Sequence, residues 1–465
     1  MIQQILIGIA LLIGVANCFA NPFAGLITLM GVNMVQPGEL YPLYNALHVE
    51  RLVALLALAM LFVKGYRFLF PPVTQWVLYF YGACLASIPL AFWISNAFGS
   101  ATDFGKIIVI HLLSVSLVTS RRRLRAMLLM FSVLVGYLAV TSLIMYFQGA
   151  FDFTMHVDRI VGLTNASNNP DTLGLTIATA MPLMFLFTYK SSSNRIRILI
   201  WILLGLVLWT LLLTGSRGSL LTLALITALA ILISRRRLLL FPAVVVLSLA
   251  IWSVLPAQYT ARYSLITSSA LKTDESYQNR LLSWEGGWHM FLHNPLTGIG
   301  IGDYTFANGS KYWPAPRKIW LNAHSLYFQI LGELGLIGVV TFGGFLVVMV
   351  RTNNRLRTSL HVIAARAAAG YPGAEPVPDW LRLLPTTCNL CLVGLLYCGY
   401  AYHDAYRSTW YFLAAITGAM DLMLRRELAT SAAGPEKNPH ETAEAVLVGG
   451  AIDWSALPRA EGDVA

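Results

Sequence analysis

Three polar features interrupt long apolar runs, and each carries a side chain that can bind an anion or move a proton. The first is the turn 214–219, which holds Arg217 among two glycines, two serines and a threonine. Glycines let backbone N–H groups approach a ligand closely, serine hydroxyls add donors, and a guanidinium is a planar fork for phosphate oxygens. We therefore expect Arg217, Ser216 and Ser219 to bind a phosphate group. The alternative is an arginine that snorkels at a membrane surface and caps a helix.

The second feature is Arg280, at the start of a segment with helical periodicity. Large apolar side chains recur there at three- and four-residue spacing: Leu281, Trp284, Trp288 and Phe291. That spacing predicts an amphipathic helix that lies at a membrane interface. We expect Arg280 to head this helix, where free N–H groups favour an anion. A plain surface arginine is the alternative.

The third feature is His324, which immediately precedes an apolar run. An imidazole has an ordinary pKa near 6.5, so it can accept a proton near neutral pH. Asn322 and Ser325 are placed to orient its ring, and Asn322 is also expected to bind the substrate. A histidine that only caps a helix would have the same neighbours. Upstream, Arg159 belongs to the polar stretch 148–170, which is either one wall of a substrate cavity or a plain loop.

Metal-ligating patterns are weak in this sequence. The acidic residues of the outer segment show no paired spacing that suits a metal: Asp274, Glu275, Glu285 and Asp303. All five cysteines lie in apolar runs, which predicts buried thiols rather than a metal site or a disulfide. We therefore expect no metal and no cofactor.

The composition places the chain among membrane proteins. Of 465 residues, 57% are hydrophobic and 12% are charged, about half the charged fraction that is usual in soluble domains. Apolar runs long enough to cross a bilayer core of about 30 Å lie at approximately 4–34, 50–64, 74–96, 104–119, 124–147, 171–189, 195–213, 217–234, 238–255, 325–351, 383–402 and 408–424. We therefore predict an all-α polytopic protein with about 12 transmembrane helices, surrounded by membrane lipids.

The net charge of +10 does not indicate a nucleic-acid partner, because the cations fall in alternate short connections. The positive-inside rule makes those connections cytoplasmic and turns the others outward. The predicted organisation is transmembrane helices over 1–255, a large periplasmic loop with the active site over 256–324, transmembrane helices over 325–426 and a disordered cytoplasmic tail over 427–465. Both termini are then cytoplasmic, unless 4–34 crosses the membrane twice and places the N-terminus outside.

Together these segments resemble the O-antigen ligase family, whose superfamily includes the Wzy polymerases and the protein O-oligosaccharyltransferases. The similar segments lie between about 150 and 350: Gly162 to Asp171, the turn 214–219, Arg280 to Gly300, and Ala323 to Gly338. The resemblance implies a glycosyltransferase of the GT-C type with a large periplasmic loop. It also implies transfer of a glycan from undecaprenyl pyrophosphate to an acceptor hydroxyl, and places the family's two arginines and histidine at Arg217, Arg280 and His324.

The expected function is that of an O-antigen ligase of the bacterial inner membrane, active in lipopolysaccharide biosynthesis. Arg217 and Arg280 would hold the pyrophosphate, and His324 would take the proton from a hydroxyl of lipid A-core, with inversion and without a metal. Three more cations of the outer loop are guessed to hold the acidic acceptor: Arg262, Arg317 and Lys318.

A polymerase and a protein O-oligosaccharyltransferase are the enzyme alternatives, and a transporter of a lipid-linked glycan is the alternative from another class. Transporters place ionisable groups near the middle of the membrane. The predicted helices of this chain have few charges at their centres, and this pattern favours an enzyme.

Overall fold

The structure is a computed structural model that describes residues 2–154, 157–164, 168–189, 193–264, 275–315, 319–371 and 375–432. Within these ranges the fold is all-α, as predicted, apart from one short β-hairpin. Nine of the described helices are long and apolar enough to cross a membrane, and two shorter apolar helices accompany them. The chain is therefore a multi-pass membrane protein. The total of 12 crossings stays a prediction.

The first 150 residues form a group of helices that pack against one another: α1 (Ile2–Ala20), α2 (Pro22–Val35), α3 (Pro37–Leu40), α4 (Pro42–Ala46), α5 (Val49–Val63), α6 (Pro72–Ser87), α7 (Ile94–Leu117) and α8 (Arg121–Phe147). The predicted stretch 4–34 is two helices, because Asn21 caps the second one through a bond from Phe23 N and Pro22 occupies its first position.

The helices α1 and α2 run antiparallel. The backbone oxygen of Gln4, at the start of α1, accepts a 2.7 Å hydrogen bond from the hydroxyl of Tyr44, which lies in α4 just after α2. The beginning of α1 therefore lies near the end of α2. If both helices cross the membrane, the N-terminus lies on the outer side, and the prediction of two cytoplasmic termini does not hold.

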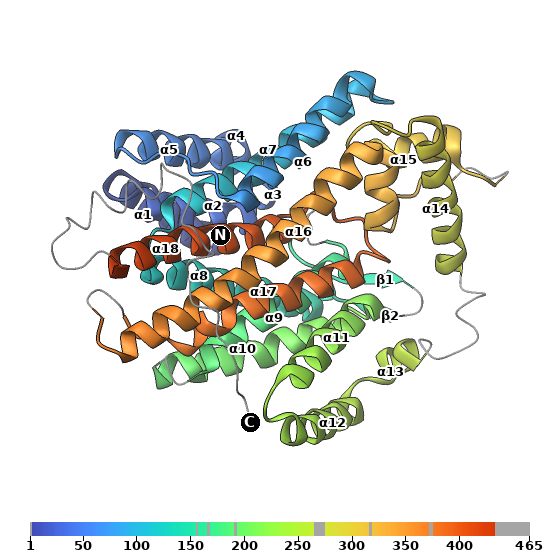
Figure 1. Ribbon diagram of the computed structural model, residues 1–465. Helices are drawn as coiled ribbons and strands as arrows, with labels where there is room; N and C mark the ends of the chain where they lie inside the picture. The colour runs from blue at the N-terminus through green and yellow to red at the C-terminus, as the bar shows by residue number, and fades with distance from the viewer. Residues whose placement is uncertain are drawn as a thin grey trace.

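The hairpin and the remaining helices complete the fold. They are β1 (Asp152–Thr154), β2 (Val157–Arg159), α9 (Pro170–Phe185), α10 (Asn194–Leu213), α11 (Arg217–Ile233), α12 (Arg237–Val254), α13 (Ala257–Ser264), α14 (Glu275–His293), α15 (Tyr304–Ala307), α16 (Leu326–Ala368), α17 (Asp379–Cys398) and α18 (Ser408–Ala432). Figure 1 shows the long helices side by side, with α14 and α15 together at one edge of the body.

Two helices extend beyond the predicted boundaries. The predicted membrane span 325–351 is part of α16, which continues to Ala368, so the basic residues that follow the span are helical. The tail expected from 427 starts later, because α18 runs to Ala432 and Glu427 forms a 2.7 Å ion pair with Arg121 at the start of α8. Residues 433–465 of the predicted tail lie outside the described residues.

The helix α14 confirms the predicted helix after Arg280, but Trp284 does not face a membrane interface. Its ring stacks on Phe328 of α16 at 5.6 Å between centroids and meets Tyr400 edge-on at 4.9 Å. The exposed members of the stripe are Leu281 and Trp288. The aromatic face of α14 therefore binds this segment to the first turns of α16, the helix that follows His324.

The main anchor of the outer segment is a break in α16 at Gly335. This residue has φ 59° and ψ −152°, a backbone conformation that suits glycine almost alone. Four hydrogen bonds of 2.9 to 3.1 Å join the backbone around the break to the loop after α14: Ile299 N to Gly332 O, Gly300 N to Glu333 O, Leu336 N to Pro295 O, and Ile337 N to Leu296 O. The break thus satisfies its own backbone groups by pairing with this loop.

Replacing Gly335 with alanine tests the anchor. A Cβ there would lie 2.6 Å from Pro295 O, in a backbone conformation that alanine avoids. We expect Gly335→Ala to lower the free energy of unfolding by about 2–4 kcal/mol. Gly343→Ala in the same helix is the matched control, because nothing lies within 4 Å of the added carbon; it should be neutral or stabilising by about 0.5–1 kcal/mol. Thermal unfolding in detergent measures both, and equal melting temperatures would contradict the anchor.

Candidate active site

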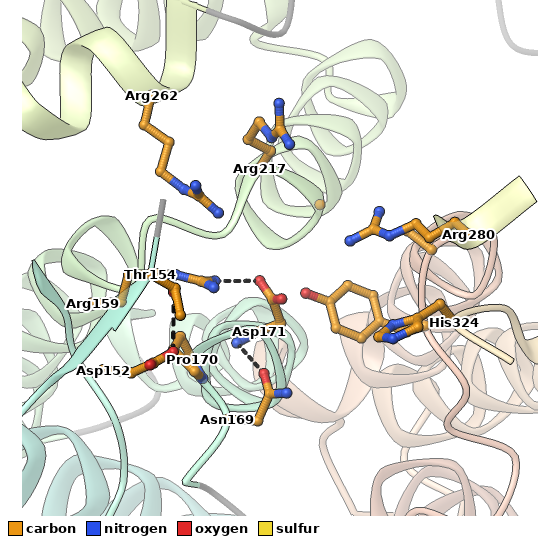
Figure 2. A pocket seen from close by; sticks show the side chains of 13 residues that line it. Asp152, Thr154, Arg159, Asn169, Pro170, Asp171, Arg217, Arg262, Arg280 and His324 are labelled. Carbon is orange, nitrogen blue, oxygen red and sulfur yellow. Dashed lines mark hydrogen bonds and ion pairs between the residues drawn. The ribbon is translucent and has the colours of Figure 1, made fainter. Parts of the chain in front are cut away.

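A cavity of about 210 Å³ gathers residues from the hairpin, α9, α11, α13, α14 and the segments before α16 and α18. Its charged lining consists of four arginines and two aspartates: Arg159, Arg217, Arg262, Arg280, Asp152 and Asp171. His324 and Tyr402 complete the polar wall. Figure 2 shows Arg159, Arg262 and Arg280 pointing toward the space beside Asp171, with Arg217 next to them. The excess of cations favours an anionic ligand.

The end of α10 positions two of these arginines. Arg159 Nε donates to Thr214 O at 2.8 Å, and Arg262 Nε donates to Gly215 O at 2.6 Å. The two preceding carbonyls are also bonded from outside the helix: Leu213 O to Ile160 N at 3.0 Å, and Leu212 O to the Tyr263 hydroxyl at 2.9 Å. The last carbonyls of a helix have no partner inside it and carry partial negative charge. They therefore bind and stabilise two cations that would otherwise repel one another.

The hairpin holds Arg159 against a carboxylate. Asp152 and Arg159 are opposite each other in the register of β1 and β2, and Arg159 is buried. One of its terminal nitrogens lies 2.6 Å from Asp171 Oδ1, and Figure 2 shows this ion pair inside the cavity. Asp171 is the second residue of α9, where an acidic side chain also favours the helix dipole. The described part of the polar stretch 148–170 thus contributes one wall of the cavity.

Arg217 is brought to the cavity by the tight turn between α10 and α11. Gly215 has φ 59°, which a residue with a side chain rarely adopts, and Ser216 then caps α11 by accepting from Ser219 N at 3.3 Å. Arg217 is therefore the first residue of α11, beside the free N–H groups that favour anions. The sequence argument for this turn agrees with its geometry.

The two serines do not line the cavity, contrary to the prediction. Ser216 and Ser219 are fully buried, and their hydroxyls lie 2.9 Å apart. Ser216 also shares a 3.1 Å hydrogen bond with the Tyr402 hydroxyl. Because both side chains are used inside the turn, they hold Arg217 and Tyr402 in place instead of binding the ligand themselves.

Arg280 lines the cavity, but for a different reason from the one expected. The helix α14 begins at Glu275, so Arg280 is its sixth residue and not its head. The free N–H groups of the helix start therefore do not lie beside this guanidinium. Its side chain reaches the cavity from the flank of α14 (Figure 2).

Arg262 belongs with the other arginines, and its predicted role in holding a separate acceptor is not supported by its place. It is buried in the same cavity, on α13. Burial and the neighbouring charges of Arg159 and Arg217 lower its pKa to about 10. When like charges lower the pKa of a cation, an anion that binds beside it stabilises its charged form. The other two guessed residues, Arg317 and Lys318, lie outside the described residues.

His324 faces the cavity in a strained backbone conformation. Its φ is 44°, in the left-handed region, which is uncommon for residues other than glycine and is often found at functional sites. Burial and the charge of Arg280 lower its pKa to about 4, although Asp171 acts in the opposite direction. The imidazole is therefore neutral at pH 7 and free to accept a proton. The ring meets that of His403 edge-on, at 5.4 Å between centroids.

Asn322 does not line the cavity, contrary to the prediction. Its backbone oxygen accepts a 2.8 Å bond from Ser283 Oγ on α14, and its side chain accepts a bond from Thr305. The residue therefore fixes the chain that leads to His324. Ser325 is buried at the start of α16.

Asp171, Tyr402 and Asp152 line the cavity and were not predicted as site residues. Asp171 had a weak local signal, since it follows Asn169-Pro170 at a helix start and lies in a segment that resembles the family. Tyr402 and Asp152 had none, because only the fold brings them to the arginines.

The described residues contain no group of three or more His, Cys, Asp or Glu side chains that could hold a metal ion. The arginine-rich lining suits an anion better than a cation. Independence from metals stays a prediction that needs an assay.

The pair Arg159–Asp171 should stabilise the fold as well as shape the site. Asp171→Asn leaves a buried guanidinium without its counter-charge, so we expect the free energy of unfolding to fall by roughly 2–3 kcal/mol. This loss is smaller than the roughly 3–5 kcal/mol of a fully buried pair, because the Asp171 side chain is 24% exposed. Asp152→Asn in the same cavity should change it by less than about 0.5 kcal/mol. Thermal unfolding of both variants checks this, and equal losses would contradict a special role for Asp171.

Comparison with known proteins agrees with the resemblance noted in the sequence. Residues 202–343 match the family model described as O-antigen ligase. The matched segment contains Arg217, Arg262, Arg280 and His324, which meet in the cavity. No curated protein matches the chain. The segment that carries these residues is therefore similar to the O-antigen ligase family.

Proposed function

We propose that the chain is a glycosyltransferase of the GT-C type in the bacterial inner membrane, which transfers a glycan from undecaprenyl pyrophosphate to a hydroxyl of lipid A-core. The family match supports ligase or polymerase chemistry in general. The finer proposal depends on one observation: four arginines surround a small cavity that also holds a neutral histidine. Cations in alternate short connections support a periplasmic position for this cavity.

The size of the cavity limits what it holds. At about 210 Å³ it is smaller than the roughly 300–1,000 Å³ typical of sites that enclose a drug-sized ligand. A whole glycan does not fit, whereas a diphosphate with the nearest atoms of the first sugar is of a suitable size. The arginines are therefore assigned to the diphosphate.

The proposed reaction is a displacement at the anomeric carbon of the first sugar. The bond from this carbon to the phosphate oxygen breaks, and the electron pair leaves with undecaprenyl pyrophosphate. Arg217 and Arg280 stabilise the charge that grows on the leaving group, with Arg159 and Arg262 beside them. The acceptor oxygen bonds to the anomeric carbon from the opposite face and gives its proton to His324. The configuration is inverted, and no metal takes part.

Transfer by the purified protein tests the proposal. Undecaprenyl-pyrophosphate glycan and lipid A-core are incubated with the protein in detergent and EDTA, and the product is resolved by size. We expect a single shifted product. His324→Ala should lower kcat/KM by about 10²–10⁴-fold, the usual contribution of a general base. Arg280→Ala should lower it by about 10²–10³-fold, as for the loss of one donor to a developing anion.

Each other outcome has a definite meaning. A ladder of products without added core would indicate a polymerase, and label on polypeptide would indicate a protein O-oligosaccharyltransferase. Activity that EDTA removes would contradict the absence of a metal. Equal transfer by the wild-type protein and His324→Ala would exclude His324 as the base. A folded sample without transfer to any acceptor would favour the transporter.

The pH profile gives a separate test. Because the pKa of His324 is lowered to about 4, the imidazole stays neutral down to about pH 5. We expect kcat/KM for the donor, measured at saturating acceptor, to keep its value from pH 7.5 to 5.5 instead of falling near 6.5. The charge of Arg280 lowers the pKa of His324. Arg280→Gln removes this charge, so the acidic limb of the variant's pH profile should move to higher pH. An acidic limb near 6.5 in the wild-type protein would contradict the assignment.

A further inference from the structure

A second, larger cavity of about 630 Å³ lies next to the arginine-lined one. The two share a thin wall that contains the segment before α18. Ala401 and Tyr402 line the first cavity, and the next two residues, His403 and Asp404, line the second. The rings of His324 and His403 meet edge-on across this wall. A ligand in the second cavity would therefore lie close to His324.

Asp404 is a buried carboxylate that is incompletely bonded. Its side chain is 2% exposed, and within the described part of the chain neither carboxylate oxygen accepts a hydrogen bond of normal geometry. The polar groups near it are the guanidinium of Arg407, the indole N–H of Trp410 and its own backbone N–H, and all three favour its charged form. Nδ1 of His403 is buried without a partner as well. Buried polar groups of folded proteins are nearly always bonded, so orphans that line a cavity indicate a ligand that completes them.

The charge of the second cavity is opposite to that of the first. Its lining has four carboxylates and two cations: Glu39, Glu50, Asp103, Asp404, Lys106 and Arg407. The first cavity has four cations and two carboxylates. Excess negative charge repels a diphosphate, whereas carboxylates readily accept hydrogen bonds from sugar hydroxyls. The two cavities therefore suit two different halves of a transfer reaction.

We propose that the second cavity binds the acceptor through a neutral, hydroxyl-rich sugar, with Asp404 and His403 bonded to its hydroxyl groups. This inference rests on the proposed function and adds the place of the second substrate. It replaces the guess that Arg262, Arg317 and Lys318 hold an acidic acceptor. The sugar comes either from a core oligosaccharide or from a second lipid-linked glycan, since both present the same hydroxyl chemistry.

Two further features of the lining bear on the ligand. Polar side chains come from loops and helix ends, as with Glu39 and Asp404, and from within α7, as with Lys106, whereas α8 adds apolar side chains such as Leu134 and Leu138. The cavity therefore offers both polar and apolar contacts to a ligand. A metal ion fits less well, because the described acidic groups do not come together in any set of three.

The ionisation of the wall is compatible with this role. Burial, with the charges nearby, lowers the pKa of His403 to about 3, so its ring is neutral at pH 7. Burial raises the pKa of Asp404 to about 7, against the effect of Arg407. Assays of Asp404 are therefore best made at pH 8, where the carboxylate is ionised.

Asp404→Asn tests the inference, since it keeps the size of the side chain and removes its charge. Initial rates are measured against acceptor concentration at saturating donor, and against donor concentration at saturating acceptor. We expect the acceptor KM to rise on the order of tenfold, the value of about one hydrogen bond to a charged group, while kcat and the donor KM change by less than about twofold. The melting temperature should fall less than that of Asp421→Asn, because the lost counter-charge of Arg407 is offset by the removal of a buried carboxylate without a hydrogen bond of normal geometry.

Asp421→Asn is the matched control. Asp421 is also buried, but it forms ion pairs with Arg355 at 2.8 Å and Arg425 at 3.0 Å, and it does not line the second cavity. We expect this variant to lose thermal stability and to keep the acceptor KM of the wild-type protein. The two aspartates should therefore show opposite effects.

A binding experiment separates this inference from the proposed function. Saturation-transfer NMR follows contact of the protein with a deacylated, phosphate-free core oligosaccharide and, in a second arm, with the free glycan repeat unit. Contact with either one that Asp404→Asn weakens supports the site, even if no transfer is found and the proposed function fails. If the wild-type protein transfers glycan but Asp404→Asn leaves the acceptor KM and the contact unchanged, the inference is wrong and the proposed function stands.

Two other results would also overturn the inference. A fall in melting temperature like that of Asp421→Asn, without a selective change in acceptor KM, would make Asp404 a structural residue. A rise in the acceptor KM of the wild-type protein on addition of EDTA would indicate a bound cation in place of the sugar.

Discussion

Four guanidinium groups around one small cavity repel one another, and the site depends on what offsets that repulsion. The carbonyl end of α10 binds two of them, through Thr214 O and Gly215 O. The carboxylate of Asp171 also forms an ion pair with one of these two, Arg159. The turn that presents those carbonyls also starts α11 with Arg217, so a single turn stabilises cations on one side and offers a positive helix end on the other. An anion is the remaining partner that this arrangement requires.

The sequence was informative where chemistry is local. Arg217 among glycines and serines, Arg280 on a periodic helix and His324 before an apolar run could each be found from neighbouring residues, and the structure places all three in one cavity. It was less informative where a role depends on distant contacts. The hydroxyls of Ser216 and Ser219 looked available for a ligand, yet each is used within the turn. Arg262 was assigned to another substrate because no sequence pattern shows that its Nε meets Gly215 O.

The same limit applies to the fold. Apolar periodicity located most helices, because lipid and protein interiors both select for it. It could not locate the break in α16, since Gly335 adopts its conformation only with the loop 294–300 against it. Hydropathy also joined α1 and α2, because Asn21-Pro22 interrupts the helix without adding charge. Asp404 lies in a short connection with no motif, and only its burial without a hydrogen bond of normal geometry distinguishes it.

The pairing of the loop 294–300 with the break in α16 has a consequence for how such chains diversify. Arg280 stands on the helix before this loop, and His324 immediately precedes α16, so the two groups are carried by one continuous block. A recombination that exchanged only residues 256–324 between relatives would separate the loop 294–300 from the part of α16 with which it pairs. A viable exchange has to include Gly335 and the residues up to about Gly338, so the outer segment and the first turns of α16 are expected to be inherited together.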